Sequence, residues 1–335
     1  MSSKFILHNI AFEVTNQCNL DCLYCYNHWK CNESFPQLNS YKKATNVLKQ
    51  LFKIADINRV AFTGGEPFLS ERFLELILFC RLQNKTVSII SNGNAGKTID
   101  YKQCLEMGVS LFQFPFLSDK AEIHDSLSGV KGSWNNALAS ITDVLSLGGR
   151  VVPVIVLTNK NNQRLRETLE FLNNAGLKQV MLNRYNIGGK YQSTNLALTK
   201  IEINSAFAIA NEVAQQEDMI ITSNVCSPVC YIDPALYPKI WFGHCSDDMS
   251  RRPITITIEG DVRLCNHSPI VAGNIFKDSF EEIFQSDYSK SWSETKPDYC
   301  NNCNLYETCK GGCRAASEQV GNSLHDVDPI ITRME

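Results

Sequence analysis

Cysteine dominates the chemistry that this sequence can perform. The chain holds 14 cysteines among 335 residues, and many of them are grouped. Cys18, Cys22 and Cys25 lie close together, four more lie between positions 300 and 313, and none lies between 105 and 225. Thiolates at such spacing can ligate zinc or iron. Three thiolates on one loop can occupy three corners of an iron–sulfur cubane and leave one iron open to another ligand.

Composition and charge limit what these cysteines can mean. The net charge is −3, from 32 basic and 35 acidic residues, so no basic field is present to bind nucleic acid. The N-terminus has no apolar segment long enough for a signal peptide, and no window approaches roughly 18 uninterrupted apolar residues. We therefore expect a cytoplasmic protein that binds neither nucleic acid nor membrane, with reduced thiols that bind metal.

Strands and helices alternate over the first 190 residues. The pattern predicts strands at 6–14, 59–63, 86–90, 111–117, 151–157 and 179–185, and helices at 40–55, 71–83, 101–107, 133–147 and 164–174. This alternation implies right-handed parallel crossovers. Six units predict a partial, open (β/α)6 TIM-like barrel, an α/β fold whose working site lies at the C-terminal ends of the strands.

The character of the chain changes after a further predicted helix at 201–216. Residues 224–313 hold eight of the fourteen cysteines, with many turn residues and short predicted strands such as the one at 254–258. We predict a barrel domain at 1–220 and a small cysteine-rich α+β domain at 221–335.

The first cysteine group resembles the cluster-binding motif of the radical S-adenosylmethionine (SAM) superfamily. It reads Cys18-x3-Cys22-x2-Cys25, with Tyr24 before the last cysteine, and it follows the first predicted strand. In that family SAM chelates the open iron of a [4Fe–4S] cluster, and its reductive cleavage releases a 5′-deoxyadenosyl radical. The alternatives are a zinc loop or three incidental buried thiols.

Other strand ends carry further elements that resemble SAM-binding segments of the family. Thr63-Gly64-Gly65-Glu66-Pro67 follows the second strand and resembles the motif that holds the amino group of SAM. Ser91-Asn92-Gly93 follows the third strand and resembles the element that reaches the ribose, although an Asn-Gly turn is the alternative. The SAM-binding residues that the resemblance implies are Gly64, Gly65, Glu66, Ser91, Asn92, Asn159 and Arg184.

The C-terminal cysteines resemble the SPASM extension of this superfamily, which carries auxiliary iron–sulfur clusters. The resemblance implies one auxiliary cluster on Cys245, Cys265 and Cys313, and a second on Cys300, Cys303 and Cys309. One or two structural zinc sites are the alternative, because tetrahedral zinc accepts the same thiolates.

Each auxiliary site lacks a fourth thiolate in this assignment. The family pattern ends with one more cysteine, and this chain has Ile331 there, so the second cluster is incomplete, absent or completed by another group. Candidate substitutes are Asp328, Asp326 and His325. Either Cys226 or Cys230 completes the first cluster, or an open iron is left for substrate.

The resemblance also implies a class of reaction. SPASM relatives mostly modify ribosomally made peptides, so we expect a crosslink, an oxidation or an epimerisation of a peptide. Because the barrel starts almost at Met1, we expect either a leader-binding domain on a separate protein or another way of binding the leader. An electron donor such as flavodoxin or ferredoxin is expected. No catalytic acid or base is identified.

Three other functions stay open. One is oxidation of a small molecule such as an aminoglycoside precursor. Another is protein oxidation of the sulfatase-maturase kind, although Asn266 stands where those enzymes carry a carboxylate base. The third is a scaffold without turnover, which predicts no cleavage of SAM.

Overall fold

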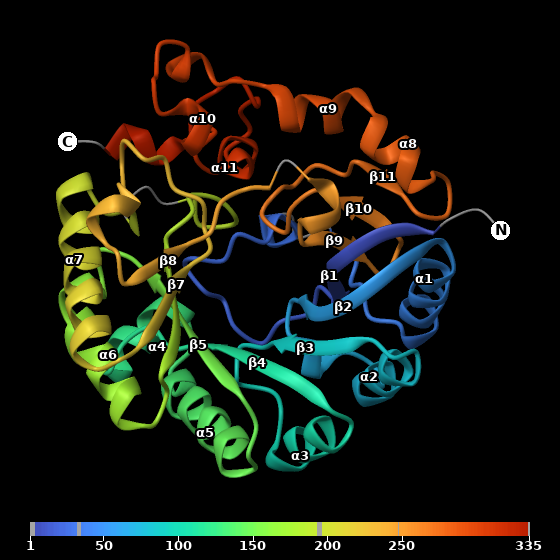
Figure 1. Ribbon diagram of the computed structural model, residues 1–335. Coiled ribbons are helices and arrows are strands. Elements are labelled where there is room, and N and C mark those ends of the chain that lie inside the picture. Colours follow the sequence, from blue (N-terminus) through green and yellow to red (C-terminus); the bar gives the residue numbers. More distant parts are fainter. Residues whose placement is uncertain (1–3, 32–34, 193–195, 247, 334–335) are drawn as a thin grey trace.

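Eleven strands of the described chain form one sheet, in the order β11-β10-β9-β1-β2-β3-β4-β5-β6-β7-β8. The computed structural model describes residues 4–31, 35–192, 196–246 and 248–333. Figure 1 shows strands β1 to β8 curving around the centre of the molecule, with helices α1 to α7 on the outside. The sheet is therefore bent into a partial barrel.

Six parallel strands and the helices between them make up most of this barrel. The strands are β1 (Phe5–Thr15), β2 (Ala55–Gly64), β3 (Thr86–Ile90), β4 (Val109–Pro115), β5 (Val151–Leu157) and β6 (Gln179–Arg184). The helices are α1 (Tyr41–Ile54), α2 (Phe73–Leu82), α3 (Thr98–Glu106), α4 (Ala121–Ser128), α5 (Ser133–Ser146), α6 (Leu165–Asn174) and α7 (Lys200–Gln216). The predicted fold class is confirmed, and α4 is an addition that the sequence pattern did not predict.

Short strands extend the sheet at both ends beyond the six predicted units. β7 (Ile220–Ser223) and β8 (Ile240–Phe242) continue it past β6 in parallel. β9 (Ile254–Thr257) pairs in parallel with β1, and β10 (Asp261–Arg263) and β11 (Gly273–Asn274) follow in antiparallel. The predicted domain boundary at 220/221 falls at the first residue of β7, inside the sheet, and stays a prediction.

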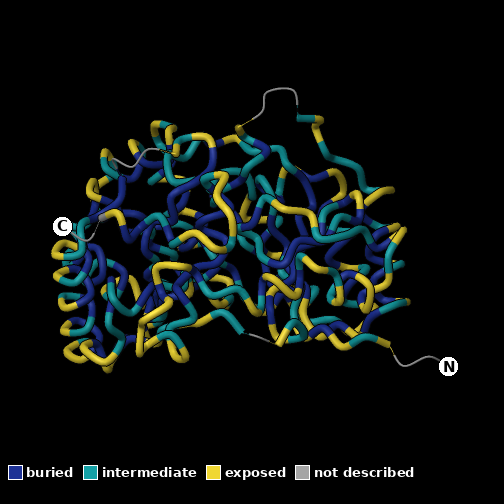
Figure 2. The backbone as a smooth tube through the Cα atoms, turned by 90° about the horizontal axis from the view of Figure 1, so that it is seen from above, coloured by how far each residue is buried: buried dark blue, intermediate teal, exposed yellow. Residues whose placement is uncertain are grey.

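The core lies between the sheet and its helices, as the buried segments in Figure 2 indicate. α1 shows how the sequence produces this layer. Ser40 caps its N-terminus by accepting from the Lys43 N–H, and its buried residues recur at helical spacing. They are Ala44, Val47, Leu48, Leu51 and Phe52. Burial of each large side chain of this kind stabilises the fold by about 1.5–3 kcal/mol.

The C-terminal region lies against the barrel at the top of Figure 1. It contains α8 (Phe280–Gln285), α9 (Asp287–Glu294), α10 (Tyr306–Cys309) and α11 (Arg314–Gln319). Two buried ion pairs fix it to the barrel: Glu13 of β1 with Arg263 of β10, and Arg184 of β6 with Asp328. No helix in the described ranges has the length and apolar character needed to cross a membrane.

Candidate active site

The loop after β1 places Cys18, Cys22 and Cys25 around one cavity. Backbone hydrogen bonds attach this loop to the end of α4. The Asp21 N–H donates to the carbonyl of Ser128 at 3.2 Å, and the Leu23 N–H donates to that of Leu127 at 2.8 Å. None of the three cysteines forms a disulfide. They come from one turn of chain at the carboxyl end of a central strand, which is where a parallel sheet places its working groups.

Close contacts that only glycine allows fix the position of this loop. Gly189 has a φ of +74°, and a Cβ there would lie 1.9 Å from the carbonyl oxygen of Cys25. A Cβ at Gly64 would lie 2.2 Å from the carbonyl oxygen of Thr15, and one at Gly65 would lie 2.0 Å from that of Gln17. The cysteine loop therefore rests directly on the backbone of its neighbours.

A lysine balances the charge of the three thiols. Burial raises the pKa of Cys22 to about 12, and it also raises the pKa of Cys25. Burial alone would lower the pKa of Lys30, but the charges of Cys25, Cys18, Cys22 and Asp21 together raise it above its ordinary value. The Lys30 Nζ donates to the carbonyl of Leu20 at 2.8 Å. A cation is thus held beside the thiols, whose charged state is the form that binds metal.

Glu66 joins the loops that follow β2 and β3. Its carboxylate is fully buried and accepts from the Asn92 N–H at 2.6 Å, the Ser91 hydroxyl at 2.9 Å and the Phe68 N–H at 3.1 Å. Burial raises the pKa of Glu66 to about 7, and these donors oppose the shift. Asn92 in turn donates to the Cys18 sulfur at 3.6 Å. The carboxylate therefore positions residues that face the cysteine loop.

The cavity has a volume of about 260 Å³ and is bounded by both parts of the chain. Its wall contains most of the SAM-binding residues that the sequence predicts, namely Gly64, Gly65, Ser91, Asn92 and Arg184. Two of the predicted residues do not line it. Glu66 lies behind the wall, and Asn159 is exposed and donates its backbone N–H to Leu196. The roles of all seven stay predictions.

Several residues of this wall were missed by sequence reasoning. The rings of Tyr26 and His267 stack with centroids 4.0 Å apart, and the Asn266 amide donates to the Tyr26 hydroxyl at 2.9 Å. Asn186 and His267 are joined by a 2.8 Å contact between Nδ2 and Nδ1. Burial lowers the pKa of His267 to about 3, so the ring is neutral. Tyr26, Asn186 and the adjacent pair Asn266–His267 come from three segments without a shared motif, and only the fold brings them together.

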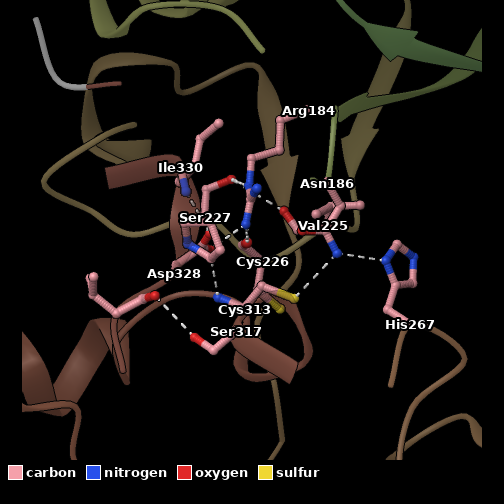
Figure 3. A network of polar contacts seen from close by, with 12 residues as sticks. Arg184, Asn186, Val225, Cys226, Ser227, His267, Cys313, Ser317, Asp328 and Ile330 are labelled. Carbon is pink, nitrogen blue, oxygen red and sulfur yellow. Dashed lines mark hydrogen bonds and ion pairs between the residues drawn. The ribbon is translucent and has the colours of Figure 1, made fainter. Parts of the chain in front are cut away.

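Arg184 connects the cavity to the C-terminal region (Figure 3). Its guanidinium donates to the carboxylate of Asp328, to the carbonyl of Cys226 at 2.9 Å and to the Ser227 hydroxyl at 3.1 Å. Both side chains of the ion pair are 1% exposed. The backbone N–H of Cys313 donates to the same Asp328 oxygen at 3.2 Å. One buried pair therefore holds β6 against two cysteine-bearing segments.

The residues of the cavity fit an iron–sulfur cluster and a polar ligand. Three cysteines can bind three irons of the cluster and leave the fourth iron open to that ligand. In the described part of the wall, Oδ1 of Asn186 is buried without a hydrogen-bond partner, which leaves an acceptor for a ligand. No three His, Cys, Asp or Glu side chains among the described residues converge tightly enough to hold a single metal ion.

The predicted ligands of the first auxiliary cluster lie near one another. A hydrogen bond to Cys245 and burial raise the pKa of Cys226, and the nearby thiols of Cys313 and Cys265 raise it further. Cys226 and Cys245 also line one cavity of about 460 Å³. The structure thus brings Cys245, Cys265 and Cys313 together and adds Cys226 to them.

The predicted ligands of the second auxiliary cluster share a different cavity, of about 280 Å³. Cys300, Cys303 and Cys309 line it together with Cys230 and Ile331. The three substitutes considered from the sequence are placed elsewhere: Asp328 is paired with Arg184, and Asp326 and His325 are exposed. The fourth cysteine of this cavity is Cys230, which its sequence context did not distinguish from Cys226.

The chain thus combines a partial barrel of parallel strands, three cysteines on its first loop, and two sets of cysteines in a C-terminal extension. This combination is typical of an iron–sulfur protein. The family model of the radical SAM superfamily matches residues 12–172, and that of the SPASM iron–sulfur cluster-binding domain matches residues 245–304. The chain belongs to the radical SAM superfamily and carries a SPASM domain. A [4Fe–4S] cluster, SAM and auxiliary clusters are the cofactors that these domains imply, as predicted.

Named relatives are distant but cover nearly the whole chain. The chain is 26% identical to the antilisterial bacteriocin subtilosin biosynthesis protein AlbA of Bacillus subtilis, over 90% of this chain and 66% of AlbA. It is 22% identical to the PqqA peptide cyclase of Granulibacter bethesdensis, over 95% and 85% of the two chains. The solved structure of anSMEcpe with bound AdoMet has a TM-score of 0.76 at 17% identity, covering 98% and 91%. The chain thus spans about two thirds of the length of AlbA.

Proposed function

We propose that this protein is a radical SAM enzyme that modifies a peptide. When bound, the cluster and SAM supply abstraction of a hydrogen atom through the 5′-deoxyadenosyl radical. The observation that carries the proposal is the single cavity in which Cys18, Cys22 and Cys25 face the glycines after β2 and the Ser91–Asn92 turn. The relative named PqqA peptide cyclase supports a peptide as the class of substrate.

The residues of the cavity divide the work of binding and exclusion. The three thiols would hold the cluster, and Lys30 offsets their charge. Gly64 and Gly65 line the cavity, and because they lack a Cβ their backbone packs directly on that of Thr15 and Gln17 beside the cysteine loop. The stacked Tyr26 and His267 rings also line the cavity and give its wall a flat, uncharged surface. Such a wall limits the access of water to a reactive centre.

Partners and location complete the proposal. A low-potential donor such as flavodoxin or ferredoxin would deliver electrons to the cluster, and a separate protein would bind the leader of the peptide. A cytoplasmic location fits the cysteines, because all 14 are outside disulfides and a reducing compartment keeps thiols in that state.

The test is anaerobic reconstitution with iron, sulfide, SAM and dithionite, followed by measurement of 5′-deoxyadenosine. The wild type should form it, and the Cys18→Ala/Cys22→Ala/Cys25→Ala variant should not. Deuterated short peptides encoded beside the gene should transfer deuterium into 5′-deoxyadenosine. Deuterium transfer from deuterated sugars or amines alone would contradict a peptide substrate. Absence of SAM cleavage by a protein that carries the cluster would contradict the proposal that it is an enzyme.

A further inference from the structure

We propose that Cys226 and Cys230 supply the two missing auxiliary ligands, Cys226 to the first cluster and Cys230 to the second. Both cysteines lie on one five-residue segment between β7 and β8. Each auxiliary cluster would then have four cysteine ligands, the full set for [4Fe–4S]. The inference concerns metal ligation and does not rest on the nature of the substrate.

The position of Cys230 is fixed by contacts of its neighbours with the second thiol group. The Val229 N–H donates to the sulfur of Cys309 at 3.2 Å. Pro228 packs on Gly312 so closely that a Cβ there would lie 2.6 Å from the proline Cγ. The segment is therefore seated on the loop that carries Cys309, and Cys230 faces the cavity that Cys300 and Cys303 also line.

Ile331 explains why a ligand from elsewhere is needed. It lines the same cavity, at the position where the family pattern has its last cysteine. Its side chain is apolar and cannot ligate iron. Cys230 reaches the cavity from the other end of the domain, about 100 residues earlier in the chain. The missing ligand is thus replaced by one from a different segment.

The position of Cys226 depends on the Arg184–Asp328 pair. Arg184 holds the carbonyl of Cys226, and Asp328 accepts from the N–H of Cys313. Each member of the buried ion pair thus holds one of the two cysteines, which lie side by side in Figure 3. Cys226 also lines a cavity together with Cys245. The set of four is completed by Cys265, whose sulfur accepts from the His267 N–H at 3.4 Å.

Full ligation has a functional consequence. A cluster whose irons all carry sulfide and cysteine has no iron free for a substrate thiol or amine. Neither auxiliary cluster would bind substrate, and the barrel cavity would be the place where substrate meets the reactive group. Electron exchange is the role that four-cysteine ligation leaves to the auxiliary clusters.

The test uses the full chain with Cys18→Ala/Cys22→Ala/Cys25→Ala, so that only auxiliary iron is counted. After anaerobic reconstitution and gel filtration, iron, sulfide and zinc are measured, and the reduced protein is examined by EPR. Adding Cys226→Ala or Cys230→Ala should each remove about four irons per chain, the content of one [4Fe–4S] cluster, and one EPR signal. Cys31→Ala removes an exposed thiol and should change neither.

A rescue variant separates ligation from folding. In the Cys230→Ala background, Ile331→Cys returns a thiol to the same cavity and should restore the lost iron and its EPR signal. Retention of all auxiliary iron by Cys230→Ala or by Cys226→Ala would overturn the proposal. So would loss of iron that Ile331→Cys does not restore, or zinc in place of iron.

Discussion

The guanidinium of Arg184 donates to the carboxylate of Asp328 across 144 residues of sequence, with both side chains almost fully buried. Removal of one member leaves a buried charge without its partner, which costs about 3–5 kcal/mol. We expect Asp328→Asn to lower the midpoint of thermal unfolding of the reconstituted protein by several degrees. The matched control is Glu307→Gln, which breaks an exposed pair with Lys310 and should cost only about 0–1 kcal/mol. Equal effects of the two variants would contradict the role given to the buried pair.

Glu66 should make stability depend on pH. The pKa of this carboxyl is about 7 in the folded chain and 4.5 as its ordinary value, so the folded state binds the proton more tightly. Its contribution to stability is therefore complete below pH 4.5 and is lost as pH rises through 7, by about 3 kcal/mol. Thermal unfolding without SAM, from about pH 5 to 8, should show this slope in the wild type and lack it in Glu66→Gln. Glu75→Gln, at an exposed position paired with Arg72, should keep the slope. A wild-type slope retained in Glu66→Gln would assign it to another group.

Gly189 should be intolerant of any side chain. A Cβ there meets the Cys25 carbonyl at 1.9 Å, so Gly189→Ala must displace the cysteine loop. We expect lower iron content at the first cluster and weaker SAM binding. Gly148→Ala is the matched control, because Gly148 has nearly the same φ, +77°, and no atom within 4 Å of the added Cβ. It should cost only the backbone strain, about 1–2 kcal/mol, with iron unchanged. Iron loss in both variants would mean that strain alone explains the effect.

Lys30 should raise the reduction potential of the first cluster. A positive charge beside the three thiols favours the more negative, reduced state. Lys30→Met should therefore lower the potential, by an amount on the order of tens of millivolts. An EPR-monitored redox titration would measure it, with exposed Lys160→Met as the control. An unchanged or higher potential would show that Lys30 acts through its hydrogen bond to Leu20 alone.

Local sequence was sufficient for the six central strands because they are mostly apolar runs of five or more residues with turn residues close behind them. β3 and β5 have the predicted bounds for this reason. β7 and β8 are four and three residues long, too short for a periodic pattern to appear. The three strands that follow them also lie in turn-rich sequence, and of these only β9 was expected, as a short strand at 254–258.

The candidate site divides in the same way. Cys18, Cys22 and the glycines after β2 lie in compact motifs, and the resemblance of these motifs to the radical SAM superfamily predicted their roles. The grouping of Cys226 and Cys230 with distant thiols depends on how the SPASM domain packs against β6 and β7. The sequence pattern left the two cysteines equivalent, and tertiary contacts assign them to different cavities.

The spacing of Cys226 and Cys230 has one more consequence. Four residues of fully extended chain span at most about 14 Å, and the turn in which the Tyr231 N–H donates to the Pro228 carbonyl shortens the path. Two metal centres ligated from this segment would be linked to each other by this short stretch of covalent chain. Because the rate of electron tunnelling falls steeply with distance, the primary structure itself would set an upper limit on the separation across which an electron must pass. Motion of the SPASM domain relative to the barrel would leave this upper limit on the distance between the two clusters unchanged.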